Sequence, residues 1–76
     1  MAIIMETIKI RDEYIKLGQL LKLAGVVGSG VDAKLIINDG LVQVNGETEY
    51  QRGKKIRAGD IVTYNNHSIK VENNDN

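Results

Sequence analysis

Positively charged side chains are the residues of this sequence best suited to bind a ligand, and they are concentrated in one segment. Four cations fall within six residues, with no acidic residue between positions 49 and 60: Arg52, Lys54, Lys55 and Arg57. Gly53, inside this run, lets the backbone approach a phosphate closely and leaves amide donors uncovered. The segment therefore suits a nucleic-acid backbone, and from the run alone it equally suits a solvated surface loop.

A second polar group lies in the N-terminal half of the chain and comprises Lys16, Gln19, Lys22, Ser29, Gly30 and Lys34. The Gly28-Ser29-Gly30 turn precedes a helical pattern, and a helix N-terminus offers free amide groups and a partial positive charge. The turn is therefore a candidate phosphate site. A serine with flanking glycines is also an ordinary N-terminal helix cap, and this is the more frequent explanation when the turn is considered alone.

Catalytic and metal-binding chemistry finds no support in the residue types. The sequence has no cysteine and one histidine, which excludes disulfides, thiolate metal sites and Cys/His pairs. The carboxylates and His67 are the candidate general bases, and none has a partner at a recognisable spacing. His67, beside Asn66, is expected to be exposed in a loop. The three tyrosines are too far apart in sequence to indicate a base-stacking platform. We therefore expect no enzyme activity, no metal and no cofactor.

The length and the overall charge restrict the remaining possibilities. The chain has 76 residues, ten Lys+Arg against ten Asp+Glu, and 42% hydrophobic residues. It is expected to form one domain over residues 1–71, followed by a flexible polar tail over residues 72–76. No stretch is long and apolar enough to cross a bilayer, so we expect a cytoplasmic protein with no membrane partner. Zero net charge argues against a nucleic-acid partner unless the cations are gathered on one face.

The elements that must position these side chains are predicted from the hydrophobic periodicity. Alternation predicts strands over residues 3–10, 41–45, 47–50, 61–64 and 67–71, and Asn45-Gly46 predicts a hairpin turn. Spacing of three and four residues predicts a helix from Leu17 that ends at Gly25, and a second helix over residues 31–38. Gly18 is unfavourable in a first helical turn unless a close approach requires it. The order of elements indicates an α+β domain.

The segments GQLLKLAG, SGVDAKLII, DGLVQVNGE and RGKKIRAGDIV, in this order and spacing, resemble the S-four (S4) RNA-binding domain, also called the alpha-L motif. The resemblance covers residues 17–62, and residues 8–15 also fit the stand-alone small proteins of the YaaA/YbcJ type. It implies two short helices packed on a small, mostly antiparallel sheet, here with an added N-terminal strand. Larger members carry fused catalytic domains, and we expect none in this chain.

The resemblance implies binding of structured RNA, with ribosomal RNA or an assembly intermediate as the expected target and a monomer as the expected state. The side chains that face RNA would then be Lys22, Ser29, Lys34, Arg52, Lys54 and Lys55, with Lys16, Gln19 and Arg57 at the margin. Gly30 departs from the family pattern, because many members carry arginine directly after the serine. The alternative is a protein-interaction module that recruits a protein partner through an exposed strand edge.

Overall fold

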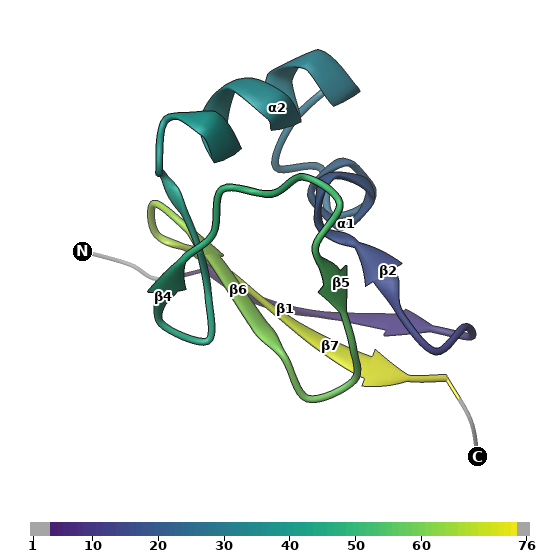
Figure 1. Ribbon diagram of the computed structural model, residues 1–76. Helices are drawn as coiled ribbons and strands as arrows, with labels where there is room; N and C mark the ends of the chain where they lie inside the picture. The colour runs from purple at the N-terminus through teal and green to yellow at the C-terminus, as the bar shows by residue number, and fades with distance from the viewer. Residues whose placement is uncertain (1–3, 75–76) are drawn as a thin grey trace.

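Two helices pack against one face of a mixed sheet, as Figure 1 shows. The structure is a computed structural model that describes residues 4–74. The helices are α1 (Leu17–Leu23) and α2 (Gly30–Asn38). The strands are β1 (Ile4–Ile10), β2 (Ile15–Lys16), β3 (Val42–Val44), β4 (Glu47–Thr48), β5 (Lys55–Ile56), β6 (Ile61–Tyr64) and β7 (His67–Asn73). The predicted α+β class is confirmed.

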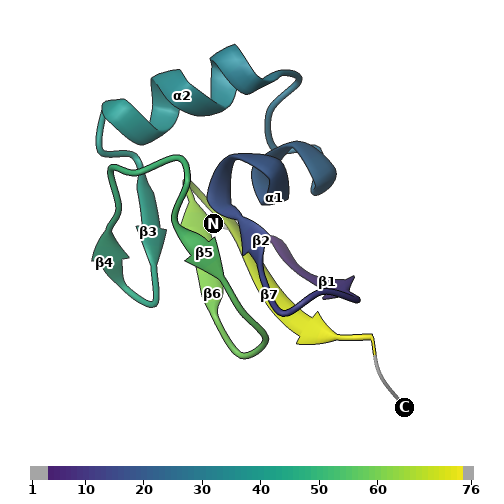
Figure 2. The ribbon, with the colours of Figure 1, turned by 45° about the vertical axis from the view of Figure 1, so that its right-hand side comes forward.

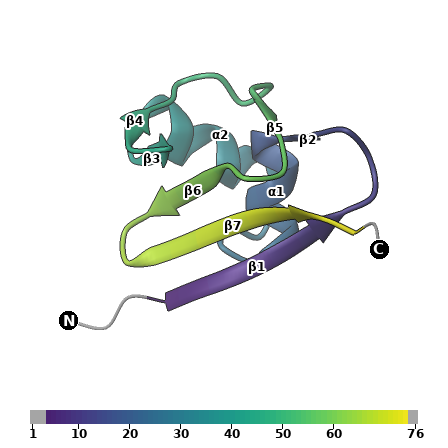
Figure 3. The same cartoon turned by 90° about the horizontal axis from the view of Figure 1, so that it is seen from below.

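The main sheet has the strand order β1-β7-β6-β3-β4. β1 runs parallel to β7, from Ile4 opposite His67 to Ile10 opposite Asn73, and the other pairs are antiparallel. Figure 3 shows β1 lying along β7. β7 continues two residues beyond the predicted end at Val71, because its last residues pair with the end of β1. Residue 3, predicted to start β1, and residues 75–76 of the predicted tail lie outside the described residues.

A small two-stranded sheet, absent from the sequence prediction, joins β2 to β5. Ile15 pairs with Ile56, and Lys16 pairs with Lys55. Strands of two residues are too short to produce a periodic pattern, so this pairing could not be recognised in the sequence. Figure 2 shows β5 beside β2, the strand that leads directly into α1. The pairing brings the chain before α1 next to residues 52–57, here called the basic segment.

The helices bury the residues that their spacing predicted. Leu17, Leu20 and Leu21 of α1 are fully buried, and Gly25 follows the helix at a φ of +74°. Ser29 begins α2 by accepting a hydrogen bond on its Oγ from the Asp32 amide at 3.2 Å. These start and stop signals agree with ordinary helix capping. The expected amphipathic helices are confirmed, with α2 beginning one residue earlier than predicted.

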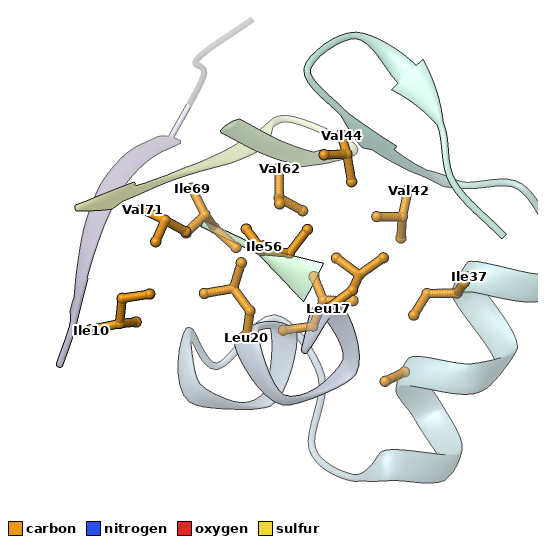
Figure 4. Packing of buried hydrophobic residues seen from close by; sticks show 12 residues of the cluster. Ile10, Leu17, Leu20, Ile37, Val42, Val44, Ile56, Val62, Ile69 and Val71 are labelled. Carbon is orange, nitrogen blue, oxygen red and sulfur yellow. The ribbon is translucent and has the colours of Figure 1, made fainter. Parts of the chain in front are cut away.

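The core lies between the helices and the sheet and includes one residue from the small sheet. Figure 4 shows Ile56 between Leu20 and Val62, with Ile69 and Val71 alongside. Ile56 is fully buried although β5 has only two residues. Burial of a large aliphatic side chain contributes roughly 2 kcal/mol. This contact anchors the basic segment to the domain.

The predicted Asn45-Gly46 hairpin is confirmed, since both residues have positive φ, 53° and 86°. This pair of angles is the one that two-residue hairpins prefer. The returning strand is shorter than predicted, Glu47–Thr48 instead of residues 47–50. Beyond it the Glu49 amide still donates to the Val42 carbonyl at 3.0 Å, and the Gln51 amide donates to the Glu49 side chain at 3.1 Å.

Asn45 also ties this hairpin to the turn over residues 57–60. Its Nδ2 donates to Asp60 Oδ1 at 3.0 Å, and its Oδ1 accepts from the Ile61 amide at 2.9 Å. Asp60 Oδ2 in turn accepts from the Arg57 amide at 2.8 Å. These three bonds fix the end of β5 relative to β3 and β6.

His67 is not the exposed loop residue that the sequence predicted. It is the first residue of β7 and half-buried, and its Nε2 lies 2.5 Å from Glu6 Oε1. The two side chains meet because β1 lies parallel to β7, which brings together residues from the two ends of the chain. Glu6, which interrupts the apolar face of β1, is thereby partnered. Neither helix formed by residues 4–74 has the length and apolar character needed to span a membrane.

Candidate nucleic-acid interface

The segment before β5 is held against the start of α1 by backbone hydrogen bonds. No side chain caps α1, whose N-cap residue is Lys16. Instead, the Leu17 amide donates to the Lys54 carbonyl at 2.9 Å and the Gly18 amide donates to the Arg52 carbonyl at 3.0 Å. These are among the amides that a helix start leaves without an intrahelical partner. The basic segment therefore supplies the cap of α1 and takes its position from it.

Gly18 is required by this close approach. A Cβ atom at position 18 would lie 2.6 Å from Arg52 Cγ and 3.1 Å from Arg52 Cδ. Any side chain there would displace Arg52, which explains a glycine in the first turn of a helix despite its poor propensity. The stem of Arg52 consequently lies directly over α1.

Docking of the segment creates a shallow hollow of ≈ 330 Å³, here called the basic hollow. It is lined by Lys16, Gly18, Gln19, Lys22, Gly30, Arg52 and Gly53. Six of the eleven predicted site residues thus come together, from β2, α1, the start of α2 and the segment before β5. No acidic residue lines it. Its three cations, and the backbone at Gly30 and Gly53 where a Cβ would meet nothing within 4 Å, give it the chemistry of an anion-binding surface.

The predicted residues on α2 have separate surroundings. Ser29 Oγ already accepts the capping hydrogen bond from the Asp32 amide, so its lone pairs are partly used within the helix start. Lys34 is exposed and stands one turn after Gly30, outside the lining of the basic hollow. It therefore flanks the hollow along α2 without contributing to its wall.

The remaining predicted cations lie on a different part of the surface. Lys54, Lys55 and Arg57 line another depression, of ≈ 370 Å³, together with Glu47, Glu49 and Asp60. The run of four cations in the sequence is thus divided: Arg52 lies in the basic hollow, and the other three lie beside carboxylates. Carboxylates this close lower the positive potential of the depression.

None of the predicted cations forms an ion pair within residues 4–74. The ion pairs found there join His67 to Glu6 and Lys70 to Glu72. Lys16 and Lys55 even lie opposite each other in the β2–β5 pair, an arrangement that is unfavourable for like charges. Among the described residues, the cations of the basic hollow therefore have no carboxylate partner within 4 Å, although Asp12 and Glu13 line a neighbouring depression together with Lys16.

Tyr14 lies beside two of the predicted cations, a position that the sequence did not indicate. Its ring centroid lies 5.0 Å from Lys55 Nζ and 5.7 Å from Arg57 Cζ, within the range of cation–π attraction. The three tyrosines were judged only by their separation in sequence, and the β2–β5 pairing that brings Tyr14 to these cations has no sequence signal. In the described part of the chain, no group of side chains is suited to hold a metal ion.

Comparison with known proteins identifies relatives over most of the chain. A family model described as S4 domain matches residues 8–72. "Probable ribosome maturation protein RlbA" of Bacillus subtilis (strain 168) is 47% identical over 55 residues, which cover 72% of this chain and 78% of that protein. "Putative RNA-binding protein YbcJ" of Escherichia coli (strain K12) is 41% identical over 58 residues, which cover 76% of this chain and 83% of that protein.

A solved structure matches the fold as well as the sequence. The solution structure of YbcJ from E. coli, described as revealing an alfaL motif involved in RNA-binding, superposes with a TM-score of 0.66 and 33% sequence identity. The match covers 95% of this chain and 90% of that chain. The expected two-helix, alpha-L architecture is confirmed.

Proposed function

The chain belongs to the S4 domain family, a family of non-catalytic RNA-binding domains, and we propose that it binds structured RNA through the basic hollow and the cations around it. Ribosomal RNA, free or in an assembly intermediate, is the proposed target, and the cytoplasm is the proposed location. The relative named for ribosome maturation supports both proposals.

The observation that carries this proposal is the set of three cations that line the basic hollow with no acidic residue among the lining. Lys16, Lys22 and Arg52 come from three segments and converge on one concave surface without an acid. The backbone of Arg52 is held there, because its carbonyl accepts a hydrogen bond from the Gly18 amide. A preformed group of cations matches the phosphates of a folded RNA by their arrangement in space, so shape should matter more than base sequence.

The structure also suggests an order of importance among the cations. Those of the basic hollow have no acidic neighbour in its lining, whereas Lys54 and Lys55 share their depression with Glu47 and Glu49. An RNA phosphate in that depression is attracted by the lysines and repelled by Glu47 and Glu49. We therefore propose that the hollow contributes more to RNA affinity than the four-cation run suggests by itself.

The first test is the salt dependence of binding to a structured ribosomal RNA fragment. Three phosphate contacts in the basic hollow predict a plot of log affinity against log salt with a slope of about −2 to −3, steeper if flanking cations also contribute. Lys22→Glu should make the slope less negative and lower the affinity. Lys70→Glu, on β7 outside the hollow, is the matched control and should leave both near the wild-type values. A slope near zero would refute phosphate binding.

A second comparison tests the proposed order of importance. The double variant Lys22→Glu/Arg52→Glu should lose more affinity than Lys54→Glu/Lys55→Glu, although both reverse two charges. All four side chains are exposed and contribute nothing to the core, so circular dichroism should show folded protein in each case. An equal or larger loss in the Lys54/Lys55 variant would place the main RNA contact on the other depression.

A protein-interaction module is the second candidate, and the exposed edge of the sheet favours it. β1 is the terminal strand in the sheet order and carries two exposed apolar residues, Ile4 and Met5. Such an edge can accept a further strand from a partner. Under this function, capture of a purified partner would survive Lys22→Glu and be lost in Met5→Lys.

A further inference from the structure

A second hollow lies on the other side of Gln19 and Lys22, between the end of β1 and α1. Its volume is ≈ 600 Å³, and it is lined by Lys9, Ile10, Arg11, Asp12, Tyr14, Ile15, Gln19, Lys22 and Leu23. We call it the β1–α1 hollow. Gln19 and Lys22 also line the basic hollow, so the two surfaces share a ridge on α1. A ligand bound in one can extend into the other.

The apolar part of the β1–α1 hollow is partly open to solvent. Leu23 is 61% exposed although it belongs to a helix whose other leucines are fully buried. Tyr14 and Ile15 are half-buried. An aromatic ring and a solvent-exposed leucine in one concave surface are typical of a ligand site, which is mostly apolar with a few polar groups at its margin.

Tyr14 lines the hollow and also lies beside two cations that are not part of the hollow. Lys55 and Arg57 contact its ring, and neither lines the β1–α1 hollow. Both cations lie within the range of cation–π attraction, which favours one position of the ring before a ligand arrives. A ring held in this way is suited to stack against a flat partner.

The rim of the hollow determines the charge of that partner. Three cations, Lys9, Arg11 and Lys22, stand against a single acid, Asp12. A partner that is flat and apolar in its middle and anionic on both sides satisfies this arrangement. A nucleotide with its two neighbouring phosphates has this form.

We propose that the β1–α1 hollow receives one unpaired RNA base, which stacks on Tyr14 and contacts Leu23. The phosphates on either side lie near Lys22 and Arg11, and the Gln19 amide is placed to hydrogen-bond the edge of the base. This inference rests on the proposed function, because it concerns an RNA that already occupies the basic hollow. It adds a preference: the RNA carries a bulged or looped-out nucleotide beside its paired region.

The test compares two RNA hairpins that differ at one unpaired position. One carries a single bulged adenosine, and the other carries an abasic nucleotide there, which keeps both phosphates and removes only the base. Stacking on an aromatic side chain predicts that wild-type protein binds the bulged adenosine roughly tenfold more tightly than the abasic RNA. The affinity for the abasic RNA reports on all phosphate contacts without the stacked base.

Variants of the hollow separate stacking from the structural role of Tyr14. Tyr14→Leu and Leu23→Gln should bind both RNAs with the affinity that wild-type shows for the abasic one, and Tyr14→Phe should behave as wild-type. The matched controls are Tyr50→Leu and Leu35→Gln. Tyr50 is 61% exposed and Leu35 is 57% exposed, and neither lines the β1–α1 hollow. Both controls should keep the tenfold preference.

The outcomes distinguish this inference from the proposed function. Equal affinity of the wild-type for both RNAs, or a preference that survives Tyr14→Leu and Leu23→Gln, would overturn the base site and leave RNA binding by the basic hollow intact. Failure of the wild-type to bind either RNA would overturn both. A loss in Tyr14→Leu of equal size on both RNAs would assign Tyr14 to bracing Lys55 and Arg57 and overturn the stacking role.

Discussion

Replacing Gly18 by alanine is the sharpest single perturbation of the basic hollow. The new Cβ would lie 2.6 Å from Arg52 Cγ, well inside van der Waals contact, and 3.7 Å from the Arg52 carbonyl oxygen, which is an ordinary contact. The side chain of Arg52 must therefore rotate, whereas the backbone bond from Gly18 to Arg52 has no steric reason to break. The substitution moves one cation out of the hollow and leaves the fold in place.

Two opposing effects determine the stability of Gly18→Ala. Alanine is favoured over glycine in a helix by about 1 kcal/mol. A side chain forced off its preferred rotamer costs about 0.5–1.5 kcal/mol, and Arg52 is exposed and has other rotamers to adopt. The two terms nearly cancel, so the free energy of unfolding should stay within about 1 kcal/mol of the wild-type value in urea denaturation.

The effect on RNA binding should be larger than the effect on stability. Loss of one phosphate contact makes the salt slope less negative by about 0.7–0.9. The assay is the same salt titration on structured RNA, run in parallel on Gly30→Ala. Gly30 lines the same hollow, but a Cβ there meets nothing within 4 Å, so this control should bind as wild-type.

Two results would refute the reasoning. A wild-type affinity and slope for Gly18→Ala would show that the position of Arg52 over α1 has no part in RNA binding. A loss of more than about 3 kcal/mol in stability would show that the added methyl group breaks the backbone contact instead of turning the side chain.

Further predictions concern the start of α2 and the hairpin. Gly30→Arg adds a cation in open space at the basic hollow, so it should tighten RNA binding and make the salt slope more negative by about 0.7–0.9. The control Gly28→Arg places its cation beside Asp32 and should gain less affinity. Equal gains in affinity would contradict the proposed position of the RNA. Asn45→Gly keeps the positive φ of the hairpin but removes both side-chain hydrogen bonds, to Asp60 and to the Ile61 amide. It should lower the free energy of unfolding by about 1–2 kcal/mol in chemical denaturation. An unchanged denaturation midpoint would show that these hydrogen bonds do not stabilise the fold.

Most of the fold follows from local patterns in the sequence. Leucine spacing predicts α1, the serine before Asp32 predicts the start of α2, and Asn45-Gly46 predicts the hairpin, because each of these signals arises within a few residues. The parallel pairing of β1 with β7 and the two-residue β2–β5 pair lack such a signal. They depend on contacts between segments far apart in the sequence, which also explains why the partner of His67 was missed.

The candidate site was predicted in composition but not in arrangement. The sequence identifies the basic segment, and Gly18 was recognised as costly unless a close approach required it, which the contact with Arg52 explains. Four cations within six residues predict a single basic surface. The structure separates Arg52 from Lys55, because the chain between them first caps α1 and then enters β5. Tyr14 was missed for the related reason that its neighbours, Lys55 of β5 and Arg57 just after it, are far away in the sequence.

The cap that the basic segment provides for α1 makes two amide protons direct reporters of the binding surface. The Leu17 and Gly18 amides stay protected from exchange with solvent only while the Lys54 and Arg52 carbonyls are in place. Detachment of the segment would expose these amides without unfolding the sheet. Their hydrogen-exchange rates therefore measure how often the surface disassembles in the free protein, and a ligand held by both sides should slow them more than the amides of β6 and β7.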